Sequence, residues 1–115
     1  MMNIKNHVQL VGRLGANPEV KELEGGKKVA SFQLAVNESY TRQNGEKVSK
    51  VQWHRVIAWG HLAGIAERIL QKGTQVTIDG KLQNREYTSK QGDKRSSTEI
   101  VANELFVISK SEKAA

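Results

Sequence analysis

The sequence contains no cysteine, a single proline and only six aromatic residues among 115. A chain without cysteine forms neither a disulfide scaffold nor a thiolate metal site, and a reducing compartment is permitted. No run of eighteen consecutive apolar residues occurs, so we expect no membrane-spanning helix. Residues 1–6 also lack the apolar stretch that a signal peptide needs. A soluble globular protein is therefore the expected class.

Positive charge is what the chain has in excess. Eighteen Lys and Arg residues against twelve Asp and Glu residues give a formal net charge of +6. A basic domain attracts polyanions, so nucleic acid is the leading partner and an anionic membrane surface a weaker alternative. The length suits one domain with a modest core. We assign this domain to residues 1–109 and expect residues 110–115 to form a short polar tail.

Apolar and polar residues alternate over several segments, which predicts five β-strands at residues 7–15, 29–36, 52–60, 74–87 and 98–108. Asn44-Gly45 predicts the tip of a long hairpin between the second and third strands. Apolar residues at helical spacing predict one short helix over residues 62–70, with Gly73 as its C-terminal cap. A helix between the third and fourth of five strands is typical of the OB-fold, an all-β Greek-key barrel. An SH3-like barrel or a sandwich is the alternative.

Strict alternation of side chains also assigns residues to the core. It places Phe32, Leu82 and Phe106 on inward positions of the second, fourth and fifth strands. Gly12 lies inside the first strand, where glycine often marks a bend or the close approach of another backbone. The pattern thus predicts a core to which the second, fourth and fifth strands contribute.

Residues for catalysis or metal binding are few. The three histidines, His7, His54 and His61, fall on different predicted elements and form no HxxxH pair, so a zinc site is not expected. The sequence has no GxSxG nucleophile motif and no pair of acidic residues on a predicted core strand. We therefore expect no catalytic residue, no metal and no cofactor.

The segment at residues 52–60 holds both tryptophans. In a strand, Trp53, Arg55, Ile57 and Trp59 share one face. The other face holds His54, Val56 and Ala58, a set small and apolar enough to be core. Flat rings with a guanidinium between them suit a chain of stacked bases with phosphates. The alternative is that both tryptophans are core residues, since most tryptophan is largely buried.

The fourth predicted strand repeats the pattern of an arginine followed by an aromatic residue. Arg85 and Tyr87 share its outward face with Lys81, and Tyr40 precedes Arg42 near the predicted hairpin tip. A solvated charged face does not need aromatic rings, and a core does not need arginines. The combination favours nucleic-acid binding.

Four segments together form a specific pattern: VQLVGRLGANPEV at 8–20, ESY at 38–40, WHRV at 53–56 and KGTQV at 72–76. Through them the chain resembles the bacterial single-stranded DNA-binding protein family from residue 6 to residue 108. The resemblance implies an OB-fold homotetramer that wraps single-stranded DNA without sequence preference. It also implies a non-enzymatic role in DNA replication, recombination and repair, in the bacterial cytoplasm at the nucleoid, with no membrane partner.

The resemblance also implies roles for single residues. The family's base-stacking aromatics match Tyr40, Trp53, Trp59 and Tyr87. Its basic DNA contacts match Arg55, Lys72 and Arg85, and also Arg42, which lies in a hairpin of variable length. Lys81 joins the backbone contacts through its outward position, and His61 stands where lysine is common, so it would bind more weakly at neutral pH. His54 matches a histidine at the family's subunit interface.

Many members of the family continue into a disordered tail with an acidic tip that recruits replication and repair proteins. The present sequence stops at Lys113-Ala114-Ala115, so we expect no such recruitment from these residues. Two other OB-fold assignments stay open. One is an accessory module, such as a primosomal or RNA-binding domain, and the other is a structural domain that binds no nucleic acid.

Overall fold

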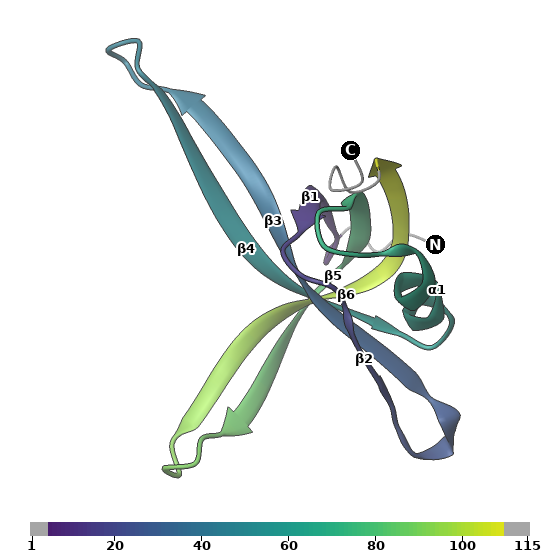
Figure 1. The fold of residues 1–115 in the computed structure, drawn as a ribbon. Helices are drawn as coiled ribbons and strands as arrows, with labels where there is room; N and C mark the ends of the chain where they lie inside the picture. The colour runs from purple at the N-terminus through teal and green to yellow at the C-terminus, as the bar shows by residue number, and fades with distance from the viewer. Residues whose placement is uncertain (1–4, 110–115) are drawn as a thin grey trace.

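The computed structural model describes residues 5–109 (Figure 1). The elements are, in chain order, β1 (Val8–Leu14), β2 (Glu19–Glu22), the 3₁₀ turn η1 (Glu24–Gly26), β3 (Lys28–Thr41), β4 (Lys47–Trp59), α1 (His61–Ile69), β5 (Gln75–Thr88) and β6 (Lys94–Ser109). All five predicted strands and the single predicted helix are present. The predicted tail at residues 110–115 lies outside the described residues.

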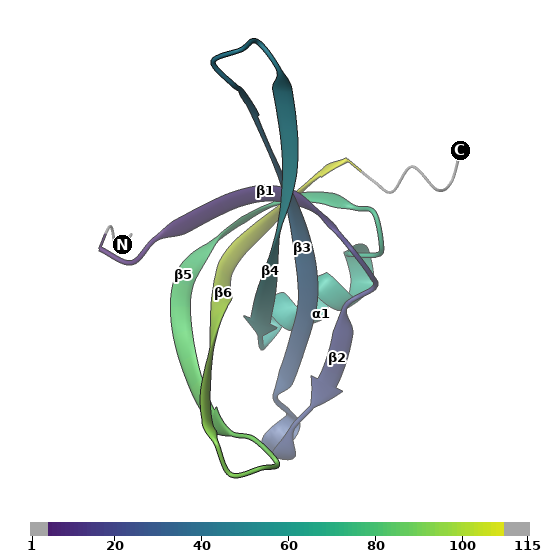
Figure 2. The same cartoon turned by 90° about the vertical axis from the view of Figure 1, so that its left-hand side faces the viewer.

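The strands form one sheet that closes on itself. Their order is β1-β5-β6-β4-β3-β2, and β1 also pairs with β3 through Arg13 and Leu14. This second pairing joins β1 and β3, which are the first and last of the five barrel strands, and so closes the sheet into a barrel. Figure 2 shows β1 crossing over β3 where the barrel closes. The all-β barrel of the OB-fold class is therefore confirmed.

One strand was not predicted. The four residues of β2 pair with β3 along the register Glu19↔Ser31 to Glu22↔Lys28, outside the barrel proper. Val20 is the only apolar residue of β2, so the segment shows no alternation that could reveal it. Because β2 adds to the count, α1 follows the fourth strand of the structure rather than the third.

Two long hairpins extend from the barrel (Figure 1). The β3–β4 arm keeps an unbroken register from Val29↔Trp59 to Thr41↔Lys47. At its tip the Arg42 N–H donates to the Glu46 carbonyl over 2.8 Å, and Gly45 has φ of 86°. The predicted turn at Asn44-Gly45 is thus confirmed, since this φ is one that glycine adopts readily.

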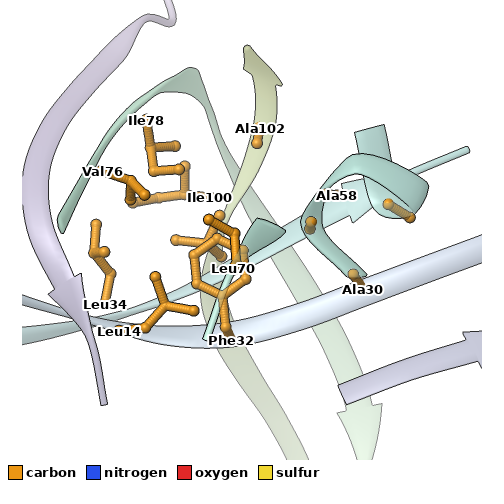
Figure 3. Packing of buried hydrophobic residues seen from close by; sticks show 13 residues of the cluster. Leu14, Ala30, Phe32, Leu34, Ala58, Leu70, Val76, Ile78, Ile100 and Ala102 are labelled. Carbon is orange, nitrogen blue, oxygen red and sulfur yellow. The ribbon is translucent and has the colours of Figure 1, made fainter. Parts of the chain in front are cut away.

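The core fills the barrel and extends under α1 (Figure 3). Fully buried side chains include Leu34 on β3, Val56 on β4 and Ile78 on β5. The helix contributes its small buried residues Ala63 and Ala66. On its outer side a 2.7 Å hydrogen bond from Lys28 Nζ to Glu67 Oε1 ties α1 to β3, and this bond raises the pKa of Lys28. The described residues hold no helix of the length and apolarity that a membrane span requires.

The predicted cap of the helix is wrong. The helix ends at Ile69, and its C-cap is Leu70, which is extended (φ −96°, ψ 142°) and 5% exposed. Gly73 lies further on, in a turn where its N–H donates to the Leu14 carbonyl over 2.9 Å. The chain therefore leaves the helix early, because Leu70 has to turn into the core before β5 begins.

Alternation misplaced two residues of the predicted core. The register between β5 and β6 shifts between Asp79 and Gly80, which leaves Asn103 without a partner as a β-bulge. Beyond the bulge the parity of β6 is reversed, so Phe106 pairs with Thr77 on the outer face and is 58% exposed. Leu82 keeps its inward parity but is also exposed, because the β5–β6 arm leaves the barrel there.

Gly12 confirms the expected close approach of two backbones. A Cβ atom at this position would overlap the carbonyl oxygen of Ala35 on β3. The two strands cross here at the closure of the barrel, where Arg13 pairs with Ala35. Only glycine leaves room for this crossing.

Candidate nucleic-acid interface

The outer face of β4 carries the two tryptophans. Trp53 is 58% exposed and Trp59 is 49% exposed, so the alternative that they are core residues is wrong. Their cross-strand neighbours on β3 are Ala35 for Trp53 and Val29 for Trp59. These neighbours are too small to cover an indole ring, which leaves both rings accessible to a planar ligand.

The indole ring of Trp53 packs against the backbone of Gly15. A Cβ atom on Gly15 would lie 2.6 Å from Cζ3 and 2.9 Å from Cη2 of the Trp53 indole. Gly15 is itself held by a 3.0 Å hydrogen bond from its N–H to the Gln33 carbonyl. Gly15 is the last residue of the first predicted strand, and the sequence pattern gave it no role, although a glycine in a strand often marks the close approach of another group.

Replacing Gly15 by alanine is expected to displace the Trp53 ring, because the new methyl group would occupy the space of the indole. The change should shift the tryptophan emission and near-ultraviolet circular dichroism in a Trp59→Phe background, where Trp53 is the only tryptophan. Gly64→Ala in α1 is the control, since a Cβ there meets no atom within 4 Å. Unchanged spectra for Gly15→Ala would show that the ring is not held by this backbone.

A groove of about 300 Å³ lies beside Trp59 on the same outer face. Ile57 forms part of it and is only 7% exposed. Strict alternation puts Ile57 on the outer face, and the unbroken register of β3 and β4 contains no bulge that would turn it inward. Ile57 lies in the wall of the groove between its strand partners Ser31 on β3 and Val101 on β6. It is lined by Glu19, Lys21, Leu23, Val29, Ser31, Arg55, Ile57, Trp59, Gln83, Arg85, Glu99 and Val101.

Two arginines meet one buried carboxylate in this groove. Arg55 donates from Nε to Oε2 of Glu99 over 3.1 Å. Nη1 of Arg85 lies 3.9 Å from the same oxygen. The Glu99 side chain is 4% exposed, whereas those of Arg55 and Arg85 are 45% and 61% exposed. Sequence reasoning missed Glu99, because an isolated acidic residue in a basic chain is usually a solvated one.

The remaining aromatic candidates lie on the two arms. Tyr40 is on β3 opposite Val48, and Tyr87 is on β5 opposite Arg95. Both tyrosines are exposed. The structure therefore distributes the four predicted stacking residues over both hairpins and the barrel wall between them, rather than gathering them in one pocket.

The basic candidates are more scattered. Arg55 and Arg85 share the groove, Lys81 lies opposite Val101 at its side, and Arg42 is at the tip of the β3–β4 arm. His61 begins α1, and Lys72 lies in the following turn, where its N–H donates to Oδ1 of Asn17 over 2.8 Å. Neither of these two residues lines the groove.

His54 lies on the opposite face of β4 from the tryptophans, as predicted. It pairs with Leu34 and is half-buried.

Within residues 5–109 there is no group of three or more His, Asp or Glu side chains arranged to hold a metal ion. The outer face of the barrel thus offers aromatic rings and cations.

The model of the single-strand binding protein family matches residues 5–108. The chain belongs to the single-strand binding protein family. The likeness inferred from the sequence is confirmed.

Members of this family among the curated proteins match nearly all of the chain. It is 41% identical to single-stranded DNA-binding protein 1 of Chlorobaculum tepidum, over 90% of this chain and 64% of that protein. It is 40% identical to the single-stranded DNA-binding protein of Neisseria meningitidis serogroup A, over 90% of this chain and 59% of that protein. The chain therefore spans about six tenths of the length of these two relatives.

Solved structures of the family have the same fold. A Plasmodium falciparum SSB, in a complex with ssDNA, has a TM-score of 0.85 and 33% identity, and the match covers 90% of this chain and 95% of that one. A deletion mutant of the single-stranded DNA binding protein from Thermus aquaticus has a TM-score of 0.80 and 28% identity, covering 90% and 50%. Both values support the OB barrel assignment.

Proposed function

We propose that this domain binds single-stranded DNA without sequence preference and without catalysis, and so serves DNA replication, recombination and repair. The observation that carries the proposal is the pair of exposed tryptophans on one face of β4 with Arg55 between them. Base stacking on an aromatic side chain is worth about 1–3 kcal/mol per base and tolerates any sequence. Family membership and the solved SSB complex with ssDNA support the same function.

The proposed DNA path follows the exposed aromatic residues of the two arms and of the barrel wall. It runs from the β3–β4 arm, over the barrel wall, to the β5–β6 arm, with bases stacked on Tyr40, Trp53, Trp59 and Tyr87. The proposed phosphate contacts along it are Arg42, Arg55, His61, Lys72, Lys81 and Arg85. Each neutralised phosphate releases counterions, so affinity should fall steeply with salt. Capture of the open strand should oppose reannealing.

A titration with oligo-dT of increasing length tests this function. Because both tryptophans are exposed on the proposed path, we expect oligo-dT to quench their fluorescence, with a signal that saturates at the site size. Absence of quenching would favour a structural OB domain instead. Competition by oligo-rU of equal length separates a DNA-preferring domain from an RNA-binding one.

We further propose that four copies assemble into a tetramer. One edge of β1 pairs with β3 only through Arg13 and Leu14. Along residues 8–12 the backbone N–H and C=O groups of this edge therefore have no partner strand within the described chain. Next to this edge, Val11, Thr77 and Phe106 form a row across β1, β5 and β6. Val11 and Phe106 are both exposed, and a second copy would cover them. His54 is also a proposed interface residue.

The proposed place of action is the bacterial cytoplasm, at the nucleoid, where single strands are exposed during replication. Replication and repair proteins are proposed partners only if the full-length protein carries an acidic C-terminal tail. The proposed binding uses base stacking and phosphate contacts with counterion release, and no step of it involves a metal or a cofactor.

A further inference from the structure

Glu99 places a negative charge in the lining of a groove that is proposed to bind a polyanion. It is one of two buried polar or charged residues among residues 5–109, the other being Thr74. A buried carboxylate is costly unless it is paired and hydrogen-bonded. Glu99 meets this requirement through Arg55, whose Nε donates to it over 3.1 Å. The Arg55–Glu99 pair is therefore a structural part of the groove wall.

The two arginines stand in different relations to this carboxylate. Arg55 uses one of its five N–H donors on Glu99, which fixes the guanidinium and leaves its terminal nitrogens for a ligand. Arg85 is 3.9 Å away, too far for a hydrogen bond, and its side chain is 61% exposed. A phosphate could therefore draw Arg85 away at little cost. Drawing Arg55 away would leave Glu99 buried and unpaired.

We infer that Glu99 is an internal counter-ion of the DNA site, which positions Arg55 and competes with phosphate for Arg85. This inference rests on the proposed DNA-binding function. Glu99 reduces the charge of the three-residue cluster from +2 to +1, so it weakens the attraction for the strand. Arg55 is the fixed contact of the groove, and Arg85 is the contact that moves to the phosphate.

Glu99→Gln tests the competition directly. The amide keeps the size of the side chain and an oxygen that accepts from Arg55, but it removes the charge. We expect oligo-dT to bind roughly three- to tenfold more tightly at low salt, with the gain disappearing at high salt. Glu104→Gln, an exposed residue on the same strand and outside the groove lining, is the matched control and should bind like wild type.

A double-mutant cycle tests the positioning role. Arg55→Ala alone leaves the carboxylate without its hydrogen-bond partner, so it should weaken binding more than Arg55→Ala combined with Glu99→Gln. The gain from Glu99→Gln should be larger in the Arg55→Ala background than in wild type. Urea unfolding of each variant monitors the fold, and a purely structural Glu99 would change only that measurement.

Arg85→Ala provides a test that leaves the Glu99–Arg55 bond intact. It should reduce the slope of log affinity against log salt by about 0.7, the value for one phosphate contact to a single strand. The inference is overturned if the slope is unchanged, or if Glu99→Gln binds like Glu104→Gln in both backgrounds. A wild-type protein that does not bind oligo-dT at all would instead refute the proposed function.

Discussion

Replacing both Trp53 and Trp59 by alanine is expected to weaken binding to oligo-dT by on the order of a hundredfold, and each single replacement by about tenfold or more. The reason is the loss of one stacking platform per ring. Both rings are about half exposed and lie outside the core, so the fold should survive their removal. Affinity is measured by anisotropy of labelled oligo-dT, since tryptophan fluorescence is lost in the double variant.

Ile69→Ala is the control for this loss of surface. Ile69 is exposed to a similar degree as Trp59, but it lies on α1 and outside the groove lining. It should bind DNA like wild type. If the single and double tryptophan variants also bound like wild type, the bases would have to lie elsewhere and the proposed path would be wrong.

Much of this site could be predicted because strands impose a simple rule on side chains. A period of two fixes Trp53, Arg55 and Trp59 on one face whatever the barrel around them looks like. The tip of the β3–β4 arm could be predicted equally well, since Asn-Gly supplies the backbone freedom that a tight hairpin needs. These inferences depend only on local geometry.

Features that depend on the registry between strands could not be predicted. The bulge at Asn103 reverses the parity of β6 and brings Phe106 to the surface. Residues 105–108 are all apolar, so alternation does not show which of them face inward. The burial of Ile57 and Glu99 arises because the β5–β6 arm and β2 enclose the same groove. Each result requires two distant segments to meet, which no periodicity within one segment encodes.

The support of Trp53 by Gly15 belongs to the same category. Nothing in the local sequence relates the end of β1 to the middle of β4, which are 38 positions apart. Closure of the barrel through Arg13 and Ala35 brings them together, because Ala35 is also the cross-strand partner of Trp53. The stacking site therefore depends on barrel closure, and a substitution that disrupts the pairing of β1 with β3 should also disrupt the site.

Phe106→Arg is expected to break the proposed tetramer into smaller species at micromolar concentration. Phe106 is 58% exposed on the outer face of β6, in the row that it forms with Thr77 and Val11. An arginine there would be tolerated by a free surface, but burial of its charge against a second copy would cost several kcal/mol. Light scattering measures the mass.

Ile69→Arg makes the same chemical change at an exposed apolar residue of α1 and should leave the mass unaltered. Short oligo-dT should still bind to Phe106→Arg, because the aromatic face of β4 is intact. Long oligo-dT should bind more weakly, because linked sites raise the effective concentration of each next contact and separated subunits lose this gain. A wild-type protein that is a stable monomer, or a Phe106→Arg variant of unchanged mass, would show that this apolar row is not where the copies meet.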